Sequence, residues 1–297
     1  MPWYFFSLVG MLFAAGYALS QKWALNLKIN IFKLLTYVFV GSFVCYAFYS
    51  FIILHGFNSL VGKLTSPINL LLALSIAALS FFGNIFYMHA VDKSPNPGYV
   101  EGINITNVLL VLIGSAIFLD APISWLKAGG ILVVLIGVFL LTVERGQTKS
   151  ATGNWKPWAF AAMISFGLMF VVVKAMTNAG FAPEQVLTIL FFFAGIGFLI
   201  TNCLKRVGLR LGDTPRIVII PIVLAILASF MDNLMQYIGI KLVPNPGYST
   251  AVFYSSTVLI LFLSPLVFPK EAGGEFNVKK WLGVIITIGG VLLVILG

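Results

Sequence analysis

Charged residues are rare in this chain and fall at regular intervals, so they leave long stretches without any charge. Ten such windows follow one another, at residues 1–21, 34–54, 64–91, 102–119, 128–143, 157–173, 185–204, 217–231, 242–269 and 281–297. A helix needs about 20 apolar residues to cross the core of a bilayer, at about 1.5 Å of rise each. A transmembrane strand needs only about 10 and alternates polar with apolar residues, which these windows do not do. Because a helix satisfies its own backbone hydrogen bonds in lipid, the windows predict transmembrane helices.

The composition excludes a soluble protein of this size. The chain is 60% hydrophobic and 9% charged, whereas soluble domains carry roughly a quarter charged residues. The net charge of +9 is spread over the ends of the windows, with one small cluster at Lys205, Arg206 and Arg210. This pattern is typical of residues that anchor membrane helices, so we expect no nucleic-acid partner. Cys45 and Cys203 lie in apolar stretches, and we expect no disulfide framework, metal site or cofactor.

We therefore predict an all-α integral membrane protein with ten transmembrane helices. The expected spans are residues 3–21, 32–54, 67–91, 97–119, 124–143, 157–178, 184–204, 216–240, 246–268 and 279–297. The first span has no basic leader or clear cleavage site, which favours a retained helix over a signal peptide. We expect a monomer that crosses the cell membrane (the cytoplasmic membrane of a prokaryote) many times.

The basic residues predict an orientation. Connections after odd-numbered spans hold 14 of the 18 lysines and arginines, and connections after even-numbered spans hold 4. Since basic loops stay in the cytoplasm, this count places both termini outside it. A reporter fused at Gly297 that is active only in the cytoplasm would contradict this orientation.

One pentapeptide occurs twice and indicates an internal duplication. Pro-Asn-Pro-Gly-Tyr begins at residues 95 and 244, which are 149 positions apart, and Ser-Phe-x-x-Asn recurs at the same offset at 80–84 and 229–233. The pattern Lys-x₂-Gly-x₆-Gly follows in each half, at 127–137 and 280–290. We predict two five-helix repeats, residues 1–148 and 149–297, joined by the polar segment 144–155. Because five is odd, the second repeat enters the membrane upside down, as in many transporters.

This arrangement resembles the drug/metabolite transporter superfamily, specifically its EamA-type ten-helix branch. The resemblance covers nearly the whole chain. The resemblance rests on the five-plus-five repeat and on matched residues in the two halves: Gly16 and Lys22, Gly167 and Lys174, Asp120 before Gly130 and Gly137, and Glu271 before Gly283 and Gly290. The chain departs from the family in having no arginine in its second span. The resemblance also implies cytoplasmic termini, against the count of basic residues.

Only two of the nine acidic residues fall inside the expected spans, Glu101 and Asp232. Asp232 lies nine residues before Lys241, or about 13 Å along a helix, near the middle of a core about 30 Å thick. An ionisable residue at that depth usually faces a cavity or a partner. Asp232 could carry a proton between the two sides or hold a cationic substrate, and both roles stay open. Glu101 is either a second such group or a first-turn acid favoured by the helix dipole.

Polar residues share a helical face with Asp232. Ser229, Asn233 and Gln236 lie at helical spacing from it, and the first half repeats this face with Ser80, Gly83, Asn84 and Tyr87. The alternative role is hydrogen bonding between helices. The predicted substrate pathway consists of Asn84, Tyr87, Tyr99, Thr106, Asn107, Asp232, Asn233, Gln236, Tyr248, Tyr254 and Ser255. Asp232, Glu101, Lys22 and Lys174 are the candidate coupling or charge-carrying groups, although the lysines could simply extend to the interface.

The pentapeptides predict two tight hairpins, one on each membrane face. Asn96 and Asn245 are expected N-caps, each followed by a proline at the first helical position. We expect Pro97, Gly98, Pro246 and Gly247 to act as hinges or gates.

The sequence thus predicts a secondary active transporter, an exporter or exchanger, of a small polar, zwitterionic or cationic metabolite. Its expected partners are that substrate, the lipid bilayer and, if the carboxyls couple transport, protons. A channel or a non-transporting membrane scaffold or enzyme is the alternative. An enzyme would need a converging cluster of acidic or histidine side chains or a phosphate-binding motif, and the sequence contains neither.

Overall fold

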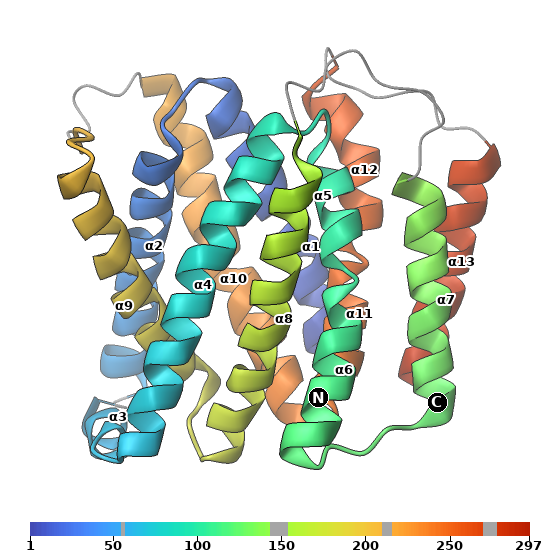
Figure 1. Cartoon of the computed structure of the whole chain (residues 1–297), viewed down its shortest axis with the longest axis horizontal. Helices are drawn as coiled ribbons and strands as arrows, with labels where there is room; N and C mark the ends of the chain where they lie inside the picture. Colours follow the sequence, from blue (N-terminus) through green and yellow to red (C-terminus); the bar gives the residue numbers. More distant parts are fainter. Residues whose placement is uncertain (55–56, 143–153, 210–215, 270–277) are drawn as a thin grey trace.

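The computed structural model describes residues 1–54, 57–142, 154–209, 216–269 and 278–297. The described residues form a helical bundle (Figure 1). Its elements are α1 (Trp3–Asn26), α2 (Ile31–Ala47), η1 (Phe48–Ile53), α3 (Phe57–Leu64), α4 (Pro67–Lys93), α5 (Pro97–Asn104), α6 (Asn107–Leu119), α7 (Trp125–Thr142), α8 (Lys156–Asn178), α9 (Pro183–Leu204), α10 (Arg216–Leu242), α11 (Pro246–Tyr254), α12 (Ser256–Val267) and α13 (Val278–Leu296). The segment 144–153, most of the predicted linker, and Glu271 lie outside the described residues.

The described residues contain ten helical segments long and apolar enough to cross a membrane, which confirms the predicted number. The chain is therefore a multi-pass integral membrane protein. The first span, Trp3–Asn26, runs five residues past its predicted end. The prediction stopped at Lys22 because a charge was expected to leave the bilayer, but this side chain is buried, with its ammonium bonded inside the protein.

Three features of the helices were not predicted. The second span ends in the π-helix η1, and the short helix α3 lies between the second and third spans. The fourth and ninth spans are each broken into two helices, α5 with α6 and α11 with α12. A hydroxyl competes for a backbone carbonyl at each break: Thr106 donates to the oxygen of Ile103 (2.7 Å) and Thr257 to that of Tyr254 (2.9 Å).

Contacts between the two halves come in matched pairs. Helix α1 packs along α10, and α8, which holds the same place in the second half, packs along α4, the counterpart of α10. Helices α2 and α9 pack together, as do α7 and α13. In Figure 1 the pair α7–α13 stands at one end of the bundle and α2–α9 toward the other, and both termini lie at the same face. This pairing is what two halves related by a two-fold axis would form.

Glycines set the closest of these contacts. A Cβ atom added to Gly137 would lie 2.8 Å from the carbonyl oxygen of Gly283, and one added to Gly283 would lie 2.8 Å from that of Gly137. Gly130 and Gly290 meet in the same way, at 3.0 and 2.8 Å. The backbones of α7 and α13 therefore touch, and small residues are what allow membrane helices to approach so closely.

Candidate substrate cavity

The two Pro-Asn-Pro-Gly-Tyr segments form the hairpins between α4 and α5 and between α10 and α11. The Oδ1 atom of Asn96 accepts from the backbone N–H of Gly98 at 2.8 Å, and Asn245 accepts from Gly247 at 3.0 Å. Both asparagines therefore cap the helices that follow, and the predicted N-caps are confirmed. A proline stands at the start of each helix, as expected.

Each hairpin packs against the far half of the other broken span. A Cβ on Gly98 would lie 2.6 Å from Leu261 in α12, and a Cβ on Gly247 would lie 2.9 Å from Leu112 in α6. Leu112 and Leu261 are themselves 149 residues apart, so the two contacts are equivalent. The Nδ2 group of Asn245 also donates to the carbonyl oxygen of Leu112, at 3.3 Å. Through these contacts, the fourth and ninth spans cross one another beside the centre of the bundle.

A cavity lies at that centre, between the helices of both halves. Its lining comes from eight of the ten spans, all but the α7–α13 pair: Ala14, Tyr17, Phe39, Ser80, Asn84, Tyr87, Glu101, Asn104, Phe166, Met169, Phe170, Leu190, Phe191, Ser229, Asp232, Asn233, Gln236, Phe253, Tyr254 and Ser256. Both hairpin helices, α5 and α11, contribute residues to it.

Two carboxyl groups line this cavity, Glu101 from α5 and Asp232 from α10. Both side chains are buried, and they lie close enough to interact electrostatically. None of the described lining residues is a lysine, arginine or histidine. Burying an ionised carboxylate without a cation is costly. Each carboxyl therefore needs either a bound proton or a positively charged group beside it.

The hydrogen bonds of the lining repeat between the halves. Asn84 Nδ2 donates to the carbonyl oxygen of Ser80 at 2.9 Å, and Asn233 Nδ2 does the same to Ser229 at 2.9 Å. Asn233 also donates to Asp232 Oδ1, at 2.6 Å. The position matching Asp232 in the first half is Gly83. The polar framework is thus symmetric, whereas the two carboxyls, Glu101 and Asp232, do not occupy equivalent positions.

Several buried polar atoms have no hydrogen-bond partner among the described residues. Three belong to the lining: Glu101 Oε2, Asn104 Oδ1 and Gln236 Nε2. All three side chains are more than nine-tenths buried. Because buried polar groups are nearly always paired, these atoms mark where a ligand or water completes the site.

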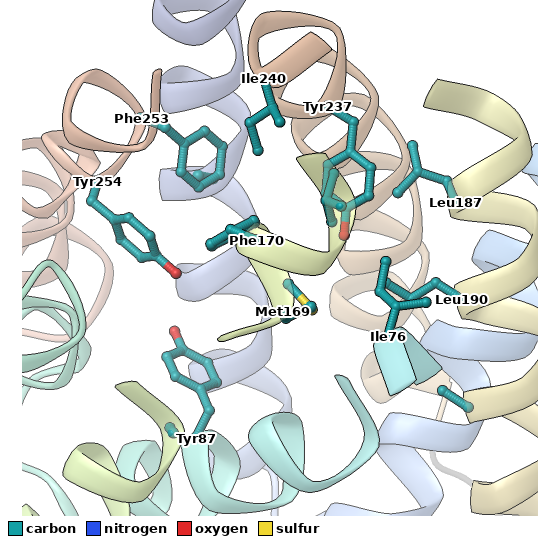
Figure 2. Close-up of a cluster of buried hydrophobic side chains, with 14 of the residues drawn as sticks. Ile76, Tyr87, Met169, Phe170, Leu187, Leu190, Tyr237, Ile240, Phe253 and Tyr254 are labelled. Atoms are coloured by element: carbon teal, nitrogen blue, oxygen red, sulfur yellow. The ribbon is translucent and has the colours of Figure 1, made fainter. Parts of the chain in front are cut away.

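Aromatic rings form much of the remaining wall. Figure 2 shows the hydroxyls of Tyr87 and Tyr254 pointing toward one another across an open space, with Phe170 and Met169 beside them. The rings of Phe170 and Tyr254 are edge-on, with centroids 6.2 Å apart. Such faces accept apolar groups and, through their π-electrons, cations.

The structure places the predicted pathway residues in two groups. Asn84, Tyr87, Asp232, Asn233, Gln236 and Tyr254 line the cavity, together with Glu101. Tyr99, Thr106, Asn107, Tyr248 and Ser255 do not, and neither do Pro97, Gly98, Pro246 and Gly247 of the hairpins. Tyr248 lies instead at the turn before α7, where its hydroxyl accepts from the Ser124 N–H at 2.6 Å and its ring meets Lys127.

Lys22 and Lys174 also lie outside the lining, and both side chains are buried. The Lys22 ammonium donates to the carbonyl oxygens of Val91 and Ser94, both at 3.1 Å. Lys174 donates to those of Ile240 (3.1 Å) and Val243 (2.7 Å). Each lysine thus binds the last carbonyls of the helix that precedes a pentapeptide, where the helix dipole favours a cation.

Sequence reasoning missed Tyr17, Asn104 and the phenylalanines of the lining. Asn104 had a usable signal, since it follows Glu101 by three residues and so shares its helix face. The pair Phe166 and Phe170, one turn apart, could be told from core residues only by the fold. Tyr17 is matched by Leu168 in the second half at the offset of Gly16 and Gly167, so the repeat gave no hint of it.

Comparison with known proteins supports a transporter. Residues 154–296 match the EamA-like transporter family. A solved crystal structure has a TM-score of 0.69 over 98% of this chain and 96% of its own, at 15% sequence identity. At that identity the likeness shows the fold alone. No curated protein matches the sequence. The resemblance expected from the sequence is confirmed by the family match over residues 154–296.

Proposed function

We propose that this protein is a secondary active transporter of a small metabolite that carries an ammonium group. The match of residues 154–296 to the EamA-like transporter family supports the transporter role. It acts in the cell membrane as an exporter or exchanger. The observation that supports this proposal most strongly is the central cavity, where Glu101 and Asp232 lie among aromatic rings and no described lining residue carries a positive charge.

The cavity chemistry selects the class of substrate. An anion would meet two carboxyls and no cation. A neutral solute would leave both carboxyls without a counter-charge unless each bound a proton. A cationic or zwitterionic metabolite supplies the missing charge, and the aromatic walls accommodate its apolar part.

Transport by alternating access is supported by the arrangement of the halves. Figure 1 shows α1 and α8, which hold equivalent positions in the two halves, running in opposite directions across the bundle. The contacts between halves occur in equivalent pairs, and the Gly98–Leu261 and Gly247–Leu112 crossings are one such pair. A two-fold axis of this kind gives two conformations of similar energy, each opening the cavity to a different side.

A ligand-stabilisation screen followed by counterflow tests the proposal. The purified protein is heated with a panel of primary amines, amino acids and dicarboxylates, and any stabilising compound is then assayed for exchange in proteoliposomes. We expect stabilisation by compounds with an ammonium group and saturable counterflow of the same compounds. A flux that is not saturable and shows no counterflow would indicate a channel.

Asp232→Asn provides the matched test of the site, because it keeps the shape and removes the charge. Asp92→Asn is its control, since Asp92 is exposed at the end of α4. We expect Asp232→Asn to abolish binding or counterflow while Asp92→Asn behaves as the wild type. Stabilisation by dicarboxylates but not by amines would refute the proposed substrate class.

A further inference from the structure

Resting on that proposed function, we infer that the cavity is built for a linear diamine, with one ammonium group at Glu101, the other at Asp232 and the carbon chain along the aromatic wall between them. Two carboxyl groups from opposite halves of the chain carry this inference, and the corner around Glu101 holds two unpaired acceptor atoms.

The first corner surrounds Glu101 at the start of α5. Tyr87 and Asn104 are the polar side chains that interact with its carboxyl. Glu101 Oε2 and Asn104 Oδ1 are buried, and neither has a hydrogen-bond partner among the described residues. An ammonium group has three N–H donors and no acceptor. It therefore matches a corner in which two acceptors are unpaired.

The second corner surrounds Asp232 in the middle of α10. One of its oxygens accepts from Asn233 at 2.6 Å, which fixes the carboxyl but does not neutralise it. Gln236, one turn further along the same face, has an unpaired Nε2 atom, an N–H donor that can bond to an oxygen of the Asp232 carboxyl or of a ligand. This corner belongs to the second half of the chain, whereas the Glu101 corner belongs to the first.

Aromatic rings line the same cavity as the two corners. Tyr17, Phe170 and Tyr254 line the cavity together with both carboxyls, and Figure 2 shows Phe170 and Tyr254 side by side. These rings offer faces to methylene groups and favour a nearby cation. The protein's own buried ammonium groups do not fill the corners, because those of Lys22 and Lys174 bind helix-end carbonyls.

A single ammonium group leaves this site incomplete. It pairs with one carboxyl, and the other must then take up a proton or remain as an unpaired buried charge, which is costly. An amino acid brings its own carboxylate toward the second acid. A diamine neutralises both corners at once, and its length decides whether both are reached.

The test measures binding of unbranched diamines of increasing length to the full-length purified protein by thermal stabilisation, beside monoamines of matched length. We expect one diamine length to bind best and the matched monoamine to bind at least about tenfold more weakly, as loss of one charge-assisted contact predicts. Counterflow in proteoliposomes should follow the same order.

Glu101→Gln removes one corner and keeps its shape. We expect this variant to bind the best diamine and its monoamine with equal affinity, whereas Asp92→Asn keeps the wild-type preference. If Glu101→Gln does not fold, the length dependence in the wild-type protein decides the question alone.

The outcomes separate this inference from the proposed function. A wild-type protein that binds monoamines as tightly as diamines, or amino acids more tightly than either, contradicts the diamine site and leaves an ammonium transporter in place. If no compound with an ammonium group is bound or exchanged, both proposals fall.

Discussion

The crossing of the two broken spans predicts that alanine substitution at two equivalent glycines destabilises the protein to different extents. Gly98 and Gly247 occupy the same position in the repeated pentapeptide, yet an added methyl group meets different atoms at each. At Gly247 it would lie 2.9 Å from Leu112 Cα and 3.1 Å from Leu112 N, which are backbone atoms. At Gly98 it would lie 2.6 Å from Cγ and Cδ2 of Leu261, which belong to a side chain.

A side chain can rotate away from a clash, whereas backbone atoms move only with their helix. Overpacking of a well-packed site costs about 1–3 kcal/mol. We expect Gly247→Ala to fall in the upper part of this range and Gly98→Ala in the lower part. With about 2 °C of melting temperature per kcal/mol for a chain of this size, the two variants should differ by a few degrees.

A second substitution at each contact sharpens the comparison. Leu261→Ala removes the atoms that Gly98→Ala would strike, so the double variant should recover part of the lost stability. Leu112→Ala keeps Cα, N and Cβ, so it should not rescue Gly247→Ala. Thermal unfolding of the six variants in one detergent measures both couplings. Equal destabilisation by the two alanines, or rescue at residue 112, would refute the packing argument.

Further predictions concern the lysines and the α7–α13 contact. Lys22→Met and Lys174→Met leave helix-end carbonyls unpaired and should each lower the free energy of unfolding by about 1–3 kcal/mol. The control Lys156→Met, at an exposed position, should unfold at the wild-type temperature. Melting curves that coincide for all three variants would show that the buried hydrogen bonds contribute nothing. Gly137→Val places a branched side chain where a single Cβ would already lie 2.8 Å from the Gly283 carbonyl oxygen. It should separate α7 from α13 and lower the yield of folded protein, as measured by size-exclusion chromatography, and a wild-type elution profile would contradict the close approach.

The sequence predicted the spans well because lipid imposes one strong rule, that a crossing segment is long, apolar and helical. Nine of the ten spans agree with the structure to within three residues at each end. The exception, the first span, depended on Lys22, whose burial follows from a contact with a helix 69 residues away. No local pattern contains that information.

The candidate site was predicted only in part, because some of its residues are brought together by contacts between distant helices. Asp232, Asn233 and Gln236 share one helix face, so their common cavity followed from helical spacing. Tyr99 and Tyr248 follow the glycines of the hairpins, and a repeated motif was taken to mark the substrate path. Tyr248 instead holds the turn before α7 through its bond to Ser124. Whether a residue of a broken span faces the cavity depends on how that span crosses its counterpart, which the sequence does not state.

The inverted relation of the repeats, residues 1–148 and 149–297, remains a prediction, as does the side of the membrane on which the termini lie. The contacts at Leu112 and Leu261 are equivalent by position and support the relation. A reporter fused at Gly297 reads the orientation directly, and the basic-residue count predicts that it stays outside the cytoplasm.

The most direct test of the central claim is counterflow of a labelled primary amine in proteoliposomes, measured for the wild type, Asp232→Asn and Asp92→Asn over a range of pH. The claim is that the carboxyls of the central cavity bind the transported ammonium group. It predicts saturable counterflow in the wild type and in Asp92→Asn, and none in Asp232→Asn. Asp232→Asn protein that exchanges the amine at the wild-type rate at every pH would contradict it.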